Sequence, residues 1–274
     1  MCTFVPMVSS VNKSNQIAMK KNILDFNLIA NESLHSAYAL MKFSPVQGTL
    51  PEMLPGQFAE VRIDDSPTTY LRRPISIHNV DYAKNELWLL VRRAGTGTDK
   101  LASLSCGAVV NMVLPLGNTF TIPTTQTHQP LLIGGGVGVA PLLYWGKELL
   151  TKGIRPAFLL GARSKNDLLQ LSEFEAVGDV YLSTEDGSIG EQGFVTQHSI
   201  LQQQFSYIYT CGPKPMMQAV AKIAREKSIP CEVSLENLMA CGVGACLCCV
   251  ENTTEGHVCV CKEGPIFNID RLTW

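Results

Sequence analysis

The sequence predicts a multidomain β plus α/β protein, with an antiparallel β-barrel domain, a doubly wound parallel-sheet α/β domain and a small C-terminal domain. Three observations predict it. Up to about residue 122, short β-rich runs alternate with Pro and Gly; from about residue 129 to 230, apolar strands alternate with helical stretches; and six of the ten cysteines lie between Cys241 and Cys261. A chain of 274 residues is long enough for two domains and a small addition.

The composition excludes several classes of protein. Hydrophobic residues make up 46% of the chain and charged residues 17%, which excludes a disordered chain. The longest apolar stretch, Leu131–Trp145, is interrupted by glycines and Pro141 and is too short for a membrane-spanning helix of about 20 residues. The net charge is −2 without a long basic run, so we expect no nucleic-acid binding. The first twenty residues are polar and lack the apolar stretch of a secretion signal, so we expect a cytoplasmic protein without membrane insertion.

The barrel is predicted for residues 20–126. Its strands are short, rich in β-branched and aromatic residues, and separated by turn residues, which is typical of antiparallel barrels. The clearest of these strands are Phe58–Ile63, Ile75–Asn79 and Leu87–Val91.

The α/β domain is predicted for residues 127–230, after a polar linker at Pro123–Pro130. Here short apolar runs alternate with longer helical stretches, as in a parallel sheet with crossover helices. The expected strands are Pro130–Gly134, Pro156–Gly161 and Tyr207–Thr210, and the expected helices are Pro141–Thr151 and Pro215–Glu226.

The remaining residues, 231–274, are too few to form a large core, so this domain needs a metal or cluster. Cys241, Cys246 and Cys249 have the spacing C-x4-C-x2-C, which matches the plant-type loop around a [2Fe–2S] cluster. Cys259 and Cys261 both qualify by position as the fourth ligand, and in an extended strand both would face the same side. Four thiolates also suit tetrahedral zinc, but structural zinc usually takes two C-x2-C pairs. The spacing therefore favours an iron–sulfur site.

Two stretches of the barrel are suited to a flavin dinucleotide. In the first, Arg73 precedes Pro74 and can pair a diphosphate, while Ser76 can bond a flavin ring nitrogen. In the second, Gly97-Thr98 belongs to a loop of small residues before a helical stretch, Asp99–Leu104, whose first amides can hold phosphate. Each stretch alone is also explained by an ordinary turn, and together they favour a flavin.

The α/β domain contains a glycine loop between its first strand and first helix. Gly134, Gly136 and Gly138 leave room for a pyrophosphate at the helix start, although tight strand–helix packing also explains them. Cys211-Gly212 ends a later strand, where a doubly wound sheet places its ligands. Cys211 is thus a candidate neighbour of a nicotinamide, or simply a buried thiol. The residues alone do not decide whether the nucleotide is NAD or NADP.

The order of these motifs resembles the ferredoxin–NADP reductase superfamily, and within it the electron-transfer subunits of B-type (NAD-dependent) dihydroorotate dehydrogenases. The resemblance covers nearly the whole chain after about residue 20. It depends most on the strings LRRPISI (71–77), GGGVGVAPL (134–142), TEDGS (184–188), TCGPKPMM (210–217) and MACGVGACLCC (239–249) followed by VCKEGPIF (260–267).

The resemblance implies three cofactors, FAD, a [2Fe–2S] cluster and NAD. The residues it implies for FAD are Arg73, Pro74, Ile75, Ser76, Leu90, Val91, Arg92, Gly97 and Thr98. Those it implies for the cluster are Cys241, Cys246, Cys249 and Cys261. Cys261 is preferred to Cys259 because the family's last ligand shortly precedes a Gly-Pro step. The chain departs from the family at Cys248, where glycine is usual, and by the additional thiol of Cys259.

The resemblance also implies a partner and a role in pyrimidine biosynthesis. The partner is a catalytic subunit that oxidises dihydroorotate on its own FMN, in a heterotetramer. Electrons then pass through the cluster to FAD, which reduces NAD⁺; flavin exchanges one or two electrons, whereas the cluster moves one. Two alternatives remain open, namely a related ferredoxin- or sulfide-type NAD(P)H reductase subunit and a non-enzymatic zinc-binding module.

Overall fold

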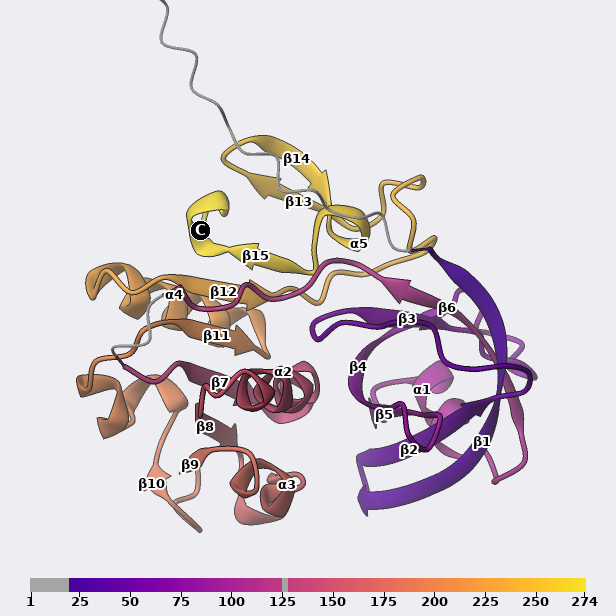
Figure 1. Cartoon of the computed structure of the whole chain (residues 1–274), viewed down its shortest axis with the longest axis horizontal. Helices are drawn as coiled ribbons and strands as arrows, with labels where there is room; N and C mark the ends of the chain where they lie inside the picture. The colour runs from indigo at the N-terminus through magenta and orange to yellow at the C-terminus, as the bar shows by residue number, and fades with distance from the viewer. Residues whose placement is uncertain (1–19, 125–127) are drawn as a thin grey trace, which may run out of the picture.

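The computed structural model describes residues 20–124 and 128–274. Residues 1–19 and 125–127 lie outside the described residues, and with them part of the predicted linker and the predicted boundary between residues 126 and 127. A barrel and an α/β domain lie side by side, and the last part of the chain runs along one edge of both (Figure 1). The predicted fold class is confirmed. In the described part of the chain, no helix is long and apolar enough to span a membrane.

The barrel consists of six antiparallel strands in the order β1-β2-β5-β4-β3-β6. Apolar side chains alternate toward its interior, where the aromatic rings of Phe26 and Phe43 are fully buried. A short helix, α1 (Thr96–Ala102), follows β5. The strands are β1 (Asn22–His35), β2 (Tyr38–Pro45), β3 (Phe58–Val61), β4 (Arg73–Asp81), β5 (Glu86–Arg92) and β6 (Val109–Leu116).

Strands β4 and β5 separate at one end of the barrel. Their ladder extends from Asp81 and Glu86 to Ile77 and Leu89. Beyond that point, Arg73–Ser76 pairs with β3, and Leu90–Arg92 pairs with β2. In the part of the chain that the structure describes, Arg73–Ser76 and Leu90–Arg92 therefore do not pair with each other, and each stretch has one free strand edge. Backbone groups at such an edge are available to a ligand.

The α/β domain is built on a seven-stranded sheet in the order β10-β9-β8-β7-β11-β12-β15, in which all strands but β15 are parallel. The strand order reverses between β7 and β11, which is the switch point where such sheets bind ligands. The strands are β7 (Leu131–Gly135), β8 (Ala157–Ala162), β9 (Asp179–Thr184), β10 (Glu191–Gln192), β11 (Ile208–Cys211), β12 (Cys231–Ser234) and β15 (Ile266–Asn268).

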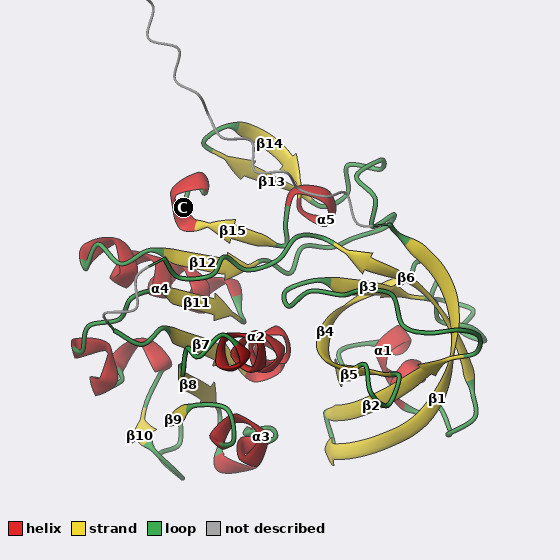
Figure 2. Cartoon of the chain, in the orientation of Figure 1, coloured by secondary structure: helices red, strands yellow, loops and turns green. Residues whose placement is uncertain are grey.

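Three α-helices cover this sheet, and short 3₁₀ turns connect its elements (Figure 2). The helices are α2 (Ala140–Thr151), α3 (Leu171–Glu175) and α4 (Lys214–Glu226). The 3₁₀ turns are Gly136–Val139, Lys165–Asp167, Val195–Gln197, Ser199–Gln202 and, near the C-terminus, Ile269–Arg271. The predicted helices Pro141–Thr151 and Pro215–Glu226 differ from the observed ones by one residue at their first turns.

The C-terminal segment is divided between the large sheet and a smaller unit. Strands β12 and β15, which fall in the range 231–274 predicted for the third domain, lie in the α/β sheet. Between them, the loop 235–249 carries three of the predicted cluster ligands without helix or strand (Figure 2). It is followed by the hairpin of β13 (Val250–Thr253) and β14 (Gly256–Cys259), and by α5 (Val260–Glu263). The division into residues 20–126, 127–230 and 231–274 stays a prediction.

The extended conformation assumed for Cys259 and Cys261 is wrong. Strand β14 ends at Cys259, and the helical turn of α5 begins at Val260. The two side chains therefore do not point to the same side of one strand, and the two thiols have different neighbours.

A buried histidine joins the barrel to the α/β domain. His78 in β4 is fully buried, and its Nδ1 lies 2.8 Å from the carbonyl oxygen of Ala140 at the start of α2. Its Nε2 lies 2.6 Å from Oε1 of Gln170, just before α3. Burial lowers the pKa of His78 below its ordinary value of 6.5, so the ring is held neutral.

Candidate functional site

The two predicted flavin stretches meet at the separated ends of β4 and β5. A Cβ added to Gly97 would lie 2.8 Å from Nε of Arg73 and 3.0 Å from Cγ2 of Thr69, so a larger residue would displace the arginine side chain from its present position. The Arg73 guanidinium is held in place because its Nη1 donates a 2.8 Å hydrogen bond to the carbonyl oxygen of Leu71. The predicted helix start at Asp99 is wrong, because α1 begins at Thr96, and Gly97 and Thr98 therefore lie in its first turn rather than in a loop. The structure thus brings together a fixed cation, a helix start rich in small residues and two unpaired strand edges. This arrangement fits a flavin dinucleotide whose phosphates lie near Arg73.

The other residues predicted for FAD differ in whether their side chains or only their backbone groups are available to a ligand. Thr98, in the first turn of α1, holds the two residues that precede the helix. Its hydroxyl accepts a 2.9 Å hydrogen bond from the Ala94 amide and donates a 3.1 Å hydrogen bond to the Gly95 carbonyl oxygen. The side chains of Leu90 and Val91 are buried in hydrophobic cores, so only their backbone groups are available to a ligand. The partly buried Pro74, Ile75 and Ser76 belong to the free edge of β4.

A cavity of about 510 Å³ lies between the barrel and the carboxyl ends of the parallel strands. Its size is in the range of small-molecule sites. The barrel contributes Tyr38 and Arg92, and the sheet contributes the loops after β7, β8, β9, β10 and β11. The lining is mainly apolar or glycine, and its charged groups on the sheet side are Arg163, Asp167 and Glu185. Such a cavity suits a dinucleotide.

The predicted glycines have different roles in this cavity. Gly136 lines it, and its φ of +56° is a conformation that favours glycine. Gly138 does not: a Cβ there would collide with the Cys211 carbonyl and lie 2.5 Å from Cα of Gly212, so this glycine permits close packing. A Cβ at Gly134 would lie 2.8 Å from Cγ1 of Val139, again inside the core. For Gly134 and Gly138, tight packing therefore explains the absence of a side chain better than room for a pyrophosphate does.

Cys211 and Gly212 form the other side of the switch point. A Cβ at Gly212 would lie 3.2 Å from the Gly135 amide, so the loops after β7 and β11 approach closely. Cys211 is fully buried, and burial raises the pKa of its thiol well above the usual value. Its Sγ lies 3.9 Å from Oε1 of Glu236, a residue that the motifs did not identify. The thiol is thus neutral and does not line the cavity.

The cysteine loop directs backbone amides at its sulfur atoms. The Gly244 amide lies 3.1 Å from Sγ of Cys261, and the Val243 amide lies 3.5 Å from Sγ of Cys241. The Val243 amide and further amides of the loop lower the pKa of Cys241 to about 6, so this thiol is ionised at neutral pH. Thiolates that accept amide hydrogen bonds are the donor set of an iron–sulfur cluster.

The four predicted ligands lie as two pairs. The Cys246 side chain lies against Cys241, and Cys261 donates from its amide to Sγ of Cys249 at 3.4 Å with its side chain also against that thiol. The side chain of Cys259 lies against Cys249 as well. In the described part of the chain, no three His, Cys, Asp or Glu side chains converge on one metal position. A two-iron cluster takes two thiolates on each iron, so the paired arrangement fits it.

The two additional thiols differ in their surroundings. Cys248 is exposed. The half-buried Cys259 sits at the end of β14, where its Sγ lies 3.9 Å from the Gly244 carbonyl oxygen, whereas the buried Cys261 accepts the Gly244 amide. The choice of Cys261 as fourth ligand stays a prediction.

Family models match two parts of the chain. The iron–sulfur cluster binding domain of dihydroorotate dehydrogenase B matches residues 236–273, and the oxidoreductase NAD-binding domain matches residues 132–222. The dihydroorotate dehydrogenase B (NAD(+)) electron transfer subunit of Shouchella clausii (strain KSM-K16) is 40% identical over 226 residues, which cover 80% of this chain and 86% of the relative. The subunit of the same name from Bacillus cereus (strain Q1) is 39% identical over 83% of this chain and 90% of the relative. The chain belongs to this family of electron-transfer subunits.

Solved structures agree with this family membership. The structure of the NADH-dependent reduced ferredoxin-NADP oxidoreductase, reported for flavin-based electron bifurcation, has a TM-score of 0.81 at 26% identity and covers 91% of this chain and 90% of that chain. The ferredoxin reductase in carbazole 1,9a-dioxygenase shares the fold, with a TM-score of 0.66 at 21% identity over 78% of this chain and 68% of that chain. The resemblance predicted from the sequence is confirmed, and so are FAD, the iron–sulfur cluster and NAD as cofactors of this family.

Sequence reasoning missed several side chains of the electron-transfer subunit. Tyr38 and Phe194 line the cavity, but each is a single aromatic residue without a motif around it. Glu60 was also missed, although a carboxylate between Ala59 and Val61 in an apolar strand is an unusual pattern. Alternation along a strand would place Glu60 in solvent, whereas the C-terminal segment covers it.

Proposed function

We propose that this chain passes electrons from the FMN of a catalytic dihydroorotate dehydrogenase subunit, through a [2Fe–2S] cluster and FAD, to NAD⁺ in pyrimidine biosynthesis. One observation carries the proposal: the three cofactor regions are contiguous in one chain. The separated ends of β4 and β5 connect to the dinucleotide cavity through Arg92, and to the cysteine loop through β3, which packs against Gly242. Electron transfer between centres requires such proximity.

The residues of the chain bind and orient the cofactors. Arg73 would hold the phosphates of FAD, and Ser76 and the backbone of Leu90–Arg92, which lie on the two free strand edges, would bind the flavin. When bound, FAD would take up two single electrons from the cluster and a proton from solvent, which together make the hydride that reduces NAD⁺. Gly136 leaves space for the dinucleotide.

The cysteine loop is also the proposed docking surface for the partner. Leu238 is 85% exposed and Leu247 66% exposed, and Val243 is exposed between them. We define these three residues as the loop patch. Large apolar side chains at the surface of a loop that holds a redox centre favour contact with another protein. The assembly proposed is a heterotetramer with the catalytic subunit, in the cytoplasm.

The test is to produce the chain together with a catalytic dihydroorotate dehydrogenase subunit and purify the complex anaerobically. The complex is expected to form NADH from dihydroorotate and NAD⁺, and Leu247→Glu is expected to weaken assembly. Ile23→Glu is the matched control, because Ile23 is 69% exposed on the barrel, outside the loop patch. Reduction of NAD⁺ by reduced ferredoxin but not by dihydroorotate would instead indicate the alternative ferredoxin-type reductase.

A further inference from the structure

Strand β3 carries a carboxylate that is buried without a partner. Glu60 is 0% exposed, and in the described part of the chain neither of its side-chain oxygens has a hydrogen-bond partner. A buried charge normally requires pairing, because removing a carboxylate from water costs several kcal/mol. An apolar side chain of similar size would fill the same space at lower cost. Packing alone therefore does not explain Glu60.

Glu60 lies between the flavin strand and the cysteine loop. On one side its backbone pairs with Pro74 of the Arg73–Ser76 stretch. On the other side its side chain packs against the loop, since a Cβ added to Gly242 would lie 2.8 Å from Cγ and 3.4 Å from Oε1 of Glu60. Gly242 directly follows the predicted ligand Cys241. The carboxylate is thus in contact with the loop that surrounds the cluster.

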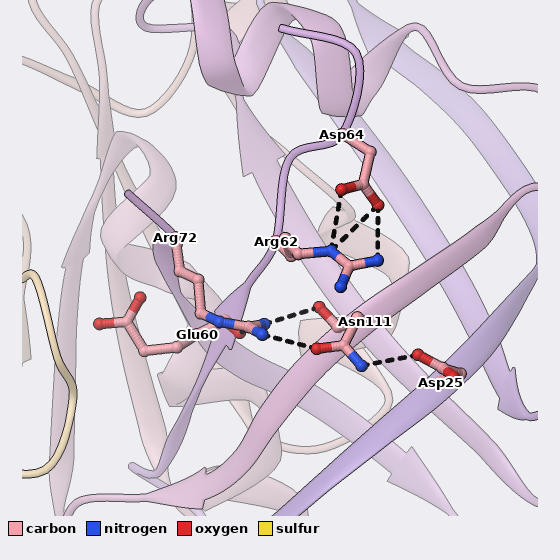
Figure 3. Close-up of polar contacts among 6 residues, drawn as sticks. All are labelled: Asp25, Glu60, Arg62, Asp64, Arg72 and Asn111. Atoms are coloured by element: carbon pink, nitrogen blue, oxygen red, sulfur yellow. Dashed lines mark hydrogen bonds and ion pairs between the residues drawn. The ribbon is translucent and has the colours of Figure 1, made fainter. Parts of the chain in front are cut away.

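The nearest cation does not neutralise this carboxylate through a hydrogen bond. Arg72 donates from Nη1 to the backbone oxygens of Glu60, at 3.2 Å, and Asn111, at 3.0 Å, and from Nη2 to Oδ1 of Asn111, at 2.6 Å. Asn111 in turn donates to Asp25. In Figure 3 the carboxylate of Glu60 points away from the guanidinium of Arg72, toward the pale trace of the C-terminal segment.

The charged groups that face Glu60 act in opposite directions. Arg72 and Arg73 favour its ionised form, and Cys241 disfavours it. Burial is the largest effect and raises the pKa of Glu60 to about 7. The carboxylate is therefore ionised in moderately alkaline solution.

We propose that Glu60 is a positioning residue that sets the reduction potential of the cluster and so favours the flow of electrons from the cluster to FAD. The inference rests on the proposed function. A negative charge held behind Gly242 disfavours an additional electron on the cluster, so its potential becomes more negative. Low dielectric around a buried group strengthens this effect, whereas water would screen an exposed charge.

The test measures the midpoint potential of the cluster in the complete, cofactor-loaded chain, by electron paramagnetic resonance during a redox titration at about pH 9. Glu60→Gln keeps the shape and removes the charge. It is expected to increase the ratio of reduced to oxidised cluster on the order of tenfold. For a one-electron couple this corresponds to a midpoint potential about 59 mV more positive. Arg72→Gln is expected to shift the potential in the negative direction, and Glu60→Asp to return it toward the wild-type value.

Asp64→Asn is the matched control. It removes one negative charge shortly after β3, but Asp64 is half exposed and pairs with Arg62 at 2.8 Å, so the potential should not change. Equal potentials in wild type, Glu60→Gln and Arg72→Gln would overturn the inference, as would an equal shift in Asp64→Asn. Formation of NADH from dihydroorotate by the wild-type complex separates this failure from that of the proposed function, because equal potentials would leave that activity in place.

Discussion

Replacing Arg73 with alanine is expected to release FAD from the chain. The guanidinium is half buried and already held by hydrogen bonds to the carbonyl oxygens of Leu71, at 2.8 Å, and Arg72, at 3.3 Å, so it loses little freedom when phosphate binds. Hydrogen bonds to a charged group contribute about 1.5–3 kcal/mol, so the affinity for FAD should fall about 10- to 100-fold. Gly97→Ala should act in the same direction more weakly, because its Cβ must displace the Arg73 side chain from 2.8 Å.

The assay is the recovery of flavin fluorescence when the purified protein is diluted, since free FAD separates from the chain. Arg62→Ala is the matched control: it removes the same charge from the barrel, but this arginine is half exposed and paired with Asp64. It should retain FAD like the wild type, because surface ion pairs contribute about 0–1 kcal/mol. Equal FAD affinity in Arg73→Ala and wild type, or equal loss in Arg62→Ala, would refute the assigned role of Arg73.

Three further predictions concern the cluster, the nucleotide and the domain contact. Cys261→Ser should lose or distort the electron paramagnetic resonance signal of the cluster, while Cys259→Ser and Cys248→Ser should retain iron and signal; loss in Cys259→Ser alone would make the ligand assignment wrong. NADH should reduce the flavin faster than NADPH in stopped-flow traces, and an equal or reversed rate would contradict the predicted preference for NAD. Because burial lowers the folded-state pKa of His78 below 6.5, unfolding binds an additional proton at acidic pH, so stability is complete above about pH 6.5 and falls as the pH drops below it. His78→Asn should reduce this fall in urea midpoints measured from about pH 8 to 5, and an unchanged pH dependence would count against a buried neutral ring.

The fold was largely predictable because its signals are local. Strand β7, the glycine loop and α2 follow directly from an apolar run, three glycines and Pro141, and the observed bounds agree within a residue. The cysteine spacing likewise requires no tertiary information. The positions of β12 and β15 could not be inferred, because pairing across more than thirty residues depends on how the loop between them folds.

The site was less predictable where tertiary packing decides the role of a residue. Gly134 and Gly138 belong to the predicted glycine motif, yet they serve packing, because their neighbours come from α2 and β11. Glu60 lies in a strand that sequence alternation would leave half exposed, and only the covering loop makes its carboxylate unusual. Cys259 and Cys261 are separated by the start of α5, a single helical turn that short-range propensity does not specify.

The central claim is that one chain holds both FAD and a [2Fe–2S] cluster and exchanges their electrons with NAD⁺. An anaerobic titration of the purified chain with dithionite, followed by visible absorption and electron paramagnetic resonance, tests it most directly. We predict uptake of about three electrons per chain, two by the flavin and one by the cluster, and reoxidation of both on addition of NAD⁺. A colourless chain that contains zinc, or a flavoprotein that takes up only two electrons, would contradict the account.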